Sequence, residues 1–135
     1  MKAGSKARYA IYLMIDITRY QANGPVPLRE VSVRQDISLK YLEQIASQLS
    51  KLGYLESVRG AQGGYRLSRD PKNISAGDIM RASEGDFVSV ACLEHTAEAC
   101  PRQSNCQKVA AFWKGLSDSI DAYTDTVSLE ELASG

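Results

Sequence analysis

Apolar residues recur at three- and four-residue steps between residues 39 and 52, which predicts the buried face of an α-helix. These apolar positions are Leu39, Leu42, Ile45, Ala46, Leu49 and Leu52. Ser38 precedes them, and its hydroxyl can accept a hydrogen bond from a free backbone N–H at a helix start. Gly53 follows them, where a helix often ends in a left-handed conformation. The pattern therefore predicts a helix over this stretch with a polar face opposite the buried one.

A glycine-rich hairpin is predicted directly after this helix. Residues 54–58 form a strand-like run, residues 65–67 form its return, and residues 59–64 (Arg-Gly-Ala-Gln-Gly-Gly) make the turn. An amphipathic helix followed by a hairpin with arginine at its tip is typical of a winged helix-turn-helix. Such a helix fits the major groove of DNA, and a slim basic hairpin can reach the adjacent minor groove. The same elements in an unrelated α+β domain are the alternative.

The rest of the chain is predicted to be helical, apart from one irregular stretch. An apolar stripe beginning after Ser5 predicts a first helix that ends near residues 21–24. Residues 28–35 form a short second helix, joined to the helix at Ser38 by a tight connection, which is the helix-turn-helix arrangement. A further short helix is predicted between a capping box at Ser75 and Asp78 and a stop at residues 84–85.

A late amphipathic helix begins at about Gln107, and Ser128 is predicted to cap one more turn after it. Its apolar residues are Val109, Ala110, Phe112, Trp113, Leu116, Ile120 and Tyr123. This is too much apolar surface to leave in water, so the helix packs on the domain or pairs with its copy in a second subunit. The predicted fold class is therefore mainly α with a small β-hairpin wing.

Composition narrows the class of protein. The 135 residues are 44% hydrophobic and 24% charged, as in ordinary globular domains, and no apolar run is long enough to span a membrane. Charged residues interrupt the N-terminal apolar stretch, so we expect no signal peptide and a cytoplasmic location. No glycine-rich nucleotide loop lies between a strand and a helix, and no Cys–His pair has an evident orienting group. We therefore predict that the protein is not an enzyme.

The net charge of zero hides an asymmetry between the two halves. Residues 1–72 carry 12 Lys and Arg against 6 Asp and Glu, whereas residues 73–135 carry 4 against 10. The basic half also holds the predicted DNA-reading helix and hairpin, which favours contact with phosphates there. A winged helix that binds only other proteins is the alternative. The salt dependence of DNA affinity distinguishes the two.

Three cysteines lie in the irregular stretch before the late helix. Cys92, Cys100 and Cys106 fall within 15 residues, and an odd number without a secretion signal argues against a disulfide framework. Thiolates are the usual ligands of iron–sulfur clusters, and a flexible loop would let the three converge. Zinc held by the three cysteines and His95 is a second reading, ranked lower because no C-x2-C knuckle is present. Free, redox-active thiols are the third.

Four segments in the same order resemble the IscR/NsrR/CymR-type regulators of bacteria (the Rrf2 family). SKARYAIYLMIDI resembles the opening helix of that family, ISLKYLEQI its recognition helix, SVRGAQGGYRLSRDP its wing, and ISAGDIMRASEG the segment that follows. The resemblance implies a homodimer that binds double-stranded promoter DNA, with long C-terminal helices crossing to form the dimer. It divides the chain into a winged helix-turn-helix domain (1–85), a cysteine-containing sensor loop (86–106) and a dimerisation helix with a C-terminal turn (107–135).

The resemblance also implies which residues touch DNA. From the recognition helix these are Ser38, Lys40, Tyr41, Glu43 and Gln44, and from the wing they are Arg59 and Gly60. Their chemistry agrees with such a role, since Gln can pair with adenine and a carboxylate can accept from cytosine N4. Lys40 and Ser38 suit phosphates. For Glu43 the alternative is a solvated carboxylate, which would repel DNA unless a base amino group lies opposite.

In many members of the family three loop cysteines hold a [2Fe–2S] or [4Fe–4S] cluster, so the resemblance assigns that role to Cys92, Cys100 and Cys106. The fourth ligand departs from the family pattern. Val109 stands where IscR-like members have a histidine, and no carboxylate lies at residues 6–8, where nitric-oxide-sensing members have an aspartate. His95, an exogenous thiol or water could complete the set. We expect a sensor of redox state, iron or nitric oxide. A cluster-free regulator like CymR, controlled by a partner enzyme or by thiol oxidation, is the alternative.

Overall fold

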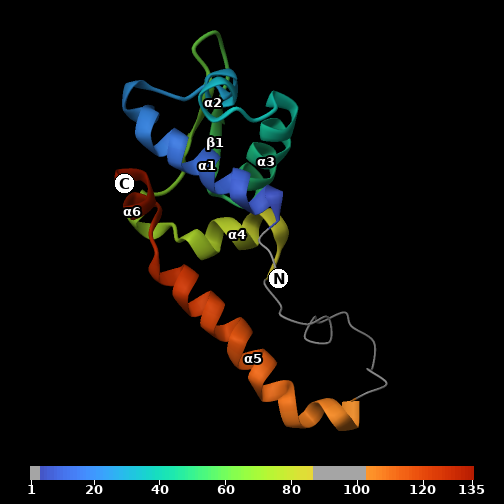
Figure 1. Ribbon diagram of the computed structural model, residues 1–135. Coiled ribbons are helices and arrows are strands. Elements are labelled where there is room, and N and C mark those ends of the chain that lie inside the picture. Colours follow the sequence, from blue (N-terminus) through green and yellow to red (C-terminus); the bar gives the residue numbers. More distant parts are fainter. Residues whose placement is uncertain (1–3, 87–102) are drawn as a thin grey trace.

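The computed structural model describes residues 4–86 and 103–135, and for residues 103–108 it describes the backbone only. The fold is mainly helical with a two-stranded hairpin, as the sequence predicts (Figure 1). The helices are α1 (Ser5–Tyr20), α2 (Leu28–Gln35), α3 (Leu39–Lys51), α4 (Ala76–Glu84), α5 (Gln103–Thr126) and α6 (Leu129–Ser134). The strands are β1 (Leu55–Val58) and β2 (Gly64–Leu67), and short 3-10 turns are η1 (Gln21–Asn23) and η2 (Pro71–Asn73).

Helix α1 forms the centre of the domain. Its predicted stripe is fully or almost fully buried, at Ala7, Ala10, Leu13, Met14 and Ile17. In Figure 1, α4 lies along one side of α1, and α2, α3 and the hairpin lie on the other side. Because every neighbouring element packs on it, α1 determines where α3 and the wing are held relative to α4 and α5.

The predicted cap and stop of α3 are confirmed, with one correction at its end. The Ser38 hydroxyl accepts a hydrogen bond from the Tyr41 N–H at 3.3 Å, and Gly53 has φ of +85°. Leu42, Ile45, Ala46 and Leu49 are buried, and Leu39 is half-buried. Leu52 was predicted to share this face but is 51% exposed. The helix ends at Lys51, so Leu52 leaves the helical period and points to solvent.

The wing is an antiparallel hairpin whose register pairs Leu55 with Leu67 and Val58 with Gly64. Its base is tied to the segment before α2, since Val26 and Tyr65 exchange two backbone hydrogen bonds of 2.8 and 2.9 Å. A Cβ at Gly64 would collide with the Val26 backbone, so glycine is required for this close approach. The hairpin is therefore fixed at its base against the domain.

Helix α4 begins with the predicted capping box. Ser75 Oγ accepts from the Asp78 N–H at 2.9 Å, and the Asp78 carboxylate accepts from the Ser75 N–H at 3.0 Å. At its other end, Glu84 accepts hydrogen bonds from the N–H groups of Gly4 and Ala7, both at 3.2 Å. The positive end of the α1 helix dipole stabilises a carboxylate at this place. The end of α4 thus caps the start of α1.

Helix α5 starts at Gln103, four residues earlier than the predicted start at Gln107. Cys106 was expected in an irregular loop, but its backbone lies in the first turn of α5. Cys92, His95 and Cys100 lie outside the described residues. Figure 1 shows α5 extending away from α1 as a long arm, with its C-terminal end next to α4.

Helix α6 returns from α5 to the core rather than continuing the arm. Leu129 is fully buried, and Arg19 of α1 donates to the backbone oxygens of Ala133 and Gly135 at 2.8 and 2.9 Å. The division at residues 85 and 106 stays a prediction. Within residues 4–86 and 103–135, no helix is long and apolar enough to cross a membrane.

Candidate nucleic-acid interface

The polar face of α3 is open to solvent at the positions expected to touch DNA. Lys40, Glu43 and Gln44 are exposed, as is the cap residue Ser38, while the opposite face of the helix is buried in the core. None of the three helical side chains has an ion pair or side-chain hydrogen bond among those described. They are therefore free to meet the donors and acceptors of base edges and phosphates.

Tyr41 differs from its neighbours because it is half-buried. Its ring lies edge-on to that of Tyr9, with centroids 5.5 Å apart, and both side chains pack against the core. Aromatic pairs in this geometry add about 1 kcal/mol beyond the area they bury. Tyr41 therefore fixes the start of α3 against the start of α1, in addition to its predicted contact with DNA.

The tip of the wing carries a cation that no other described group neutralises. Arg59 is exposed and makes no ion pair with the described residues, whereas Arg66 further down the hairpin pairs with Glu56 across the strands. Gly60 has φ of +113° and accepts a hydrogen bond from the Gly63 N–H at 3.0 Å, which closes the turn. The turn therefore leaves Arg59 available for an anionic partner.

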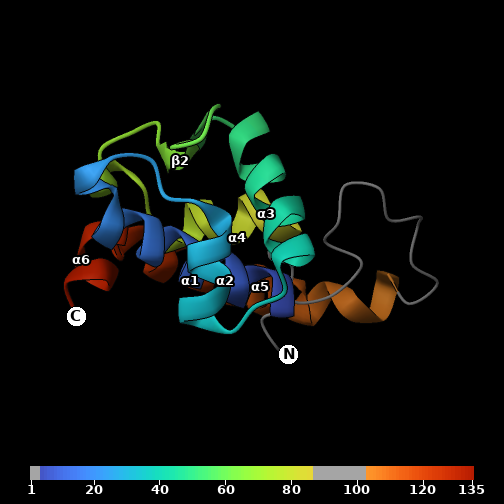
Figure 2. The ribbon, with the colours of Figure 1, turned by 90° about the horizontal axis from the view of Figure 1, so that it is seen from above.

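The start of α3, helix α2 and the tip of the wing lie at one end of the molecule. Figure 1 shows them together at the top, with α4 and α5 at the opposite end. Figure 2 looks down on that end and shows the same three elements in front of α4 and α5. The seven residues expected to touch DNA all come from α3, its cap and the wing, so they share this end. A helix and a hairpin side by side match two neighbouring grooves of a duplex.

Sequence reasoning missed the ion pair that holds α2 in place. Asp16 of α1 is fully buried and accepts hydrogen bonds from Arg34 at 2.6 and 3.0 Å and from Gln35 at 3.0 Å. Hydrogen bonding to Asp16 raises the pKa of Arg34 above its ordinary value. The Arg34 guanidinium also lies 3.8 Å from the centroid of the Tyr20 ring. The sequence feature that could have revealed this pair is Asp16 itself, an aspartate inside an apolar helical stripe, where a buried charge requires a partner.

The connection from α2 to α3 is a tight turn built on a left-handed residue. Asp36 has φ of +53°, and the Ser32 hydroxyl donates to the Ile37 backbone oxygen at 2.6 Å. Ile37 is buried, so the turn itself is anchored in the core. The buried ion pair and this turn together determine the angle at which α3 is presented.

The cysteine segment lies mostly outside the described part of the chain. Cys92, Cys100 and His95 lie outside the described residues, and for Cys106 only the backbone is described. Among the described side chains, no group of three His, Cys, Asp or Glu residues could hold a metal ion. Three thiols match the usual donor set of an iron–sulfur cluster, so the chemistry of these residues fits that group with one ligand unassigned.

A family model described as "Rrf2: Iron-dependent Transcriptional regulator" matches residues 3–135. The chain belongs to the Rrf2 family. The family resemblance predicted from the helix, wing and cysteine segments is thus confirmed, and this Rrf2 protein is a DNA-binding transcriptional regulator with a winged helix-turn-helix fold.

Relatives of this Rrf2 protein are transcriptional regulators by name. The regulator IscR of Aliivibrio salmonicida is 42% identical over 132 residues, which cover 98% of this chain and 77% of that protein. IscR of Yersinia pestis is 38% identical over the same share of this chain and 79% of its own. Both relatives are named as transcriptional regulators, not as enzymes.

Solved structures give the same fold. CymR, the global cysteine regulator of B. subtilis, superimposes with a TM-score of 0.79 at 33% identity, covering 99% of this chain and 97% of that one. IscR of T. potens superimposes with a TM-score of 0.74 at 32% identity, covering 98% and 85%. The fold is therefore shared with a cysteine regulator and with an IscR.

Proposed function

We propose that this Rrf2 protein is a homodimer that reads a two-fold related DNA site with α3 in the major groove and the wing in the minor groove. The observation that carries the proposal is that the exposed polar face of α3 and the wing lie at one end of the domain (Figure 1), and that Arg59 in the wing is exposed and makes no ion pair with the described residues. Arg59 and Gly60 would enter the minor groove, where a guanidinium meets an enhanced negative potential.

The residues of α3 divide by chemistry. Gln44 can donate to and accept from an adenine edge, and Glu43 can accept only from a base amino group such as cytosine N4. Lys40, Ser38 and the Tyr41 hydroxyl suit phosphate oxygens, which supply affinity without sequence information. Because a carboxylate near phosphates is repelled, Glu43 contributes to specificity more than to affinity.

The dimer is proposed from the exposed apolar face of α5. Phe112 is 62% exposed and Tyr123 is 70% exposed, and Val109 lies on the same side of the helix. Apolar side chains on one face of a helix that projects from its domain indicate a partner surface. A second copy fits best, because a two-fold interface brings the same patch from both chains together and gives two recognition helices.

Cys92, Cys100 and Cys106 are the residues proposed to hold an iron–sulfur cluster. When bound, such a group supplies a redox- and iron-dependent charge and constraint next to the start of α5. The fourth ligand remains to be assigned among His95, an exogenous thiol and water. Zinc on the same cysteines is the lower-ranked metal.

A regulator without a cluster is the second candidate, favoured by the superposition with B. subtilis CymR. In that case the chain would respond through a partner protein or through oxidation of its thiols. The three cysteines favour the cluster, because three thiols within 15 residues of sequence are a ready ligand set.

An anaerobic visible spectrum with iron and zinc analysis separates these readings. The measurement compares the wild type with the triple variant Cys92→Ala, Cys100→Ala, Cys106→Ala. Broad visible absorption with bound iron, absent from the triple variant, supports the cluster. A colourless wild type without metal favours the CymR-like reading, and bound zinc without iron favours the structural metal.

A further inference from the structure

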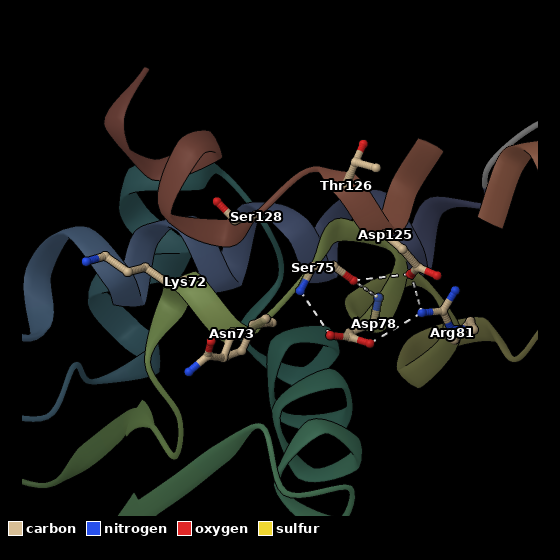
Figure 3. A pocket seen from close by; sticks show the side chains of 9 residues that line it. Lys72, Asn73, Ser75, Asp78, Arg81, Asp125, Thr126 and Ser128 are labelled. Carbon is tan, nitrogen blue, oxygen red and sulfur yellow. Dashed lines mark hydrogen bonds and ion pairs between the residues drawn. The ribbon is translucent and has the colours of Figure 1, made fainter. Parts of the chain in front are cut away.

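An arginine of α4 holds the C-terminal end of α5 at two points. Arg81 Nη2 lies 2.5 Å from Asp125 Oδ1 (Figure 3). Arg81 Nη1 lies 3.5 Å from Asp121 Oδ1. Hydrogen bonding to Asp125 raises the pKa of Arg81 above its ordinary value. Asp121 and Asp125 are four residues apart, so they lie one above the other along one face of α5.

Asp78, in the first turn of α4, helps to orient the Arg81 side chain. Asp78 Oδ1 lies 3.3 Å from Arg81 Nη2, and its other oxygen accepts from the Ser75 N–H in the capping box. Ser75 Oγ also reaches Asp125 at 3.4 Å. Figure 3 shows Ser75, Asp78, Arg81 and Asp125 turned toward one another between the two helices. The box that begins α4 is thus joined to the network that holds α5.

The two helices approach each other closely at Gly77, where an added side chain would displace the Asp125 carboxylate. A Cβ at Gly77 would collide with the Asp125 carboxylate and would lie 2.8 Å from Thr124 Oγ1. Past the end of α5, Ala76 donates to Val127 and Leu129 donates to Ile74 through backbone hydrogen bonds of 2.8 Å. This short ladder fixes where α5 ends, but a single point of attachment leaves its direction free.

A second point of attachment is needed to fix the direction of α5, and the contacts of Arg81 with Asp121 and Asp125 provide it. Contacts at Asp121 and Asp125 are one helical turn apart, so together they resist rotation of α5 about the ladder at residues 127–129. The arm is long: 24 residues at about 1.5 Å each give about 36 Å. A change in direction of about 5° would move the far end by about 3 Å, close to one base-pair step of about 3.4 Å.

We infer that Arg81 is a positioning residue that sets the direction of α5 relative to the DNA-binding half, and through it the distance between the two recognition helices. The inference rests on the proposed homodimer formed by α5. It assigns the choice of half-site spacing to Arg81, Asp121 and Asp125, which lie far from the DNA-reading residues.

The test uses full-length protein and DNA sites that differ only in spacing. A site selected from random DNA by the wild type is remade with one or two base pairs added or removed between its half-sites. Affinity for each duplex is measured by fluorescence anisotropy, and light scattering and circular dichroism report dimer and fold. The variants are Arg81→Met and Asp125→Asn, with Lys114→Met as the matched control. Among the described residues, the ion-pair partner of Lys114 is Asp118 on its own helix, at 2.7 Å.

The expected result is a change in spacing preference rather than a uniform loss. Arg81→Met should remain dimeric and lose about fivefold or more of the discrimination between the original and altered spacings. Asp125→Asn should shift the spacing preference in the same direction. The double variant should lose little more discrimination than either single variant, because Arg81 and Asp125 act in one network. The Lys114→Met profile should match the wild type.

Two results would overturn the inference. One is a spacing profile of Arg81→Met equal to that of the control, and the other is an equal loss at every spacing, which a merely structural role produces. If Arg81→Met does not fold, Asp125→Asn decides between the same outcomes. A monomeric wild type would instead contradict the proposed dimer, and with it the basis of the inference.

Discussion

Arg34 binds Asp16 through two of its nitrogens, at 2.6 and 3.0 Å, and this pair joins α2 to α1 beneath the recognition helix. Asp16 is fully buried, and the Arg34 side chain is 27% exposed. A carboxylate in this position is tolerated because it accepts three hydrogen bonds, the third from Gln35. Removing one partner leaves a buried charge without compensation, which costs more than the pair itself contributes.

Arg34→Ala should therefore lower the free energy of unfolding by about 3 kcal/mol, because it leaves the Asp16 carboxylate buried without its cation. The measurement is urea unfolding followed by circular dichroism. Arg66→Ala is the matched control, since Arg66 pairs with Glu56 at the surface, and such pairs are worth less than about 1 kcal/mol. Equal losses for the two variants would contradict a structural role for the buried pair.

Arg59→Ala should weaken DNA binding while leaving the fold and the dimer unchanged. The wing tip is exposed and Arg59 has no ion pair among the described residues, so its loss removes a DNA contact and little else. The slope of log affinity against log salt should fall by about 1 if Arg59 neutralises a phosphate or lies in the minor groove. Lys114→Ala, on α5, should leave both affinity and slope unchanged. An Arg59→Ala protein that binds like the wild type would refute the role of the wing.

Glu43→Ala should relax sequence preference more than it lowers affinity. The carboxylate is exposed on α3 and would repel phosphates unless it accepts from a base amino group. Affinities for the selected site and for a scrambled duplex should therefore converge, by about 1–3 kcal/mol for one base contact. Glu130→Ala, exposed on α6, is the control. The idea fails if cognate and scrambled DNA lose affinity equally.

Phe112→Asp should give monomers, because it places a charge in the proposed dimer seam. Phe112 is largely exposed in the single chain and packs edge-on against Trp113, with centroids 4.9 Å apart. In a monomer an aspartate there would be harmless, so the circular dichroism spectrum should stay close to that of the wild type. Light scattering reports the mass. A folded Phe112→Asp dimer would show that α5 is not the seam.

The helices that pack in the DNA-binding half could be predicted because their periods and caps agree. Ser38 and Ser75 mark the starts of α3 and α4 by hydroxyls that accept backbone hydrogen bonds, as the structure confirms. The predicted helix ended one residue too late, at Leu52 instead of Lys51. The predicted burial of Leu52 was wrong for that reason. A leucine that follows a regular stripe cannot be told from a member of it without the backbone.

The early start of α5 and the long-range contacts could not be read from the sequence. Residues 103–106 are Gln, Ser, Asn and Cys, which carry no apolar period, so nothing marks them as helical. The Arg81 contacts with Asp121 and Asp125 join residues 40 or more positions apart, and a charge pattern does not say which carboxylates an arginine will meet. The hydrogen bonds from the start of α1 to Glu84 of α4 were missed for the same reason.

The return of α6 to the core was also missed. Its six residues were predicted only as a capped turn, and the Ser128 cap is confirmed by a hydrogen bond from the Glu131 N–H at 3.1 Å. Burial of Leu129 against α1 follows from the turn after α5, which local sequence does not specify. Local pattern and family resemblance name candidate DNA-contacting residues in α3 and the wing, and their role stays a prediction. The contacts that hold α3 and the wing in place could not be read from either source.

Selection of binding sites from a random duplex pool by the purified wild type tests whether α3 and the wing read DNA sequence. We expect enrichment of a two-fold related sequence whose half-sites are separated by about one helical turn or a multiple of it. The enriched site should bind with an affinity that falls log-linearly with salt. Failure to enrich any sequence, with equal and weak binding to all duplexes, would contradict the claim that α3 and the wing form a sequence-reading DNA interface.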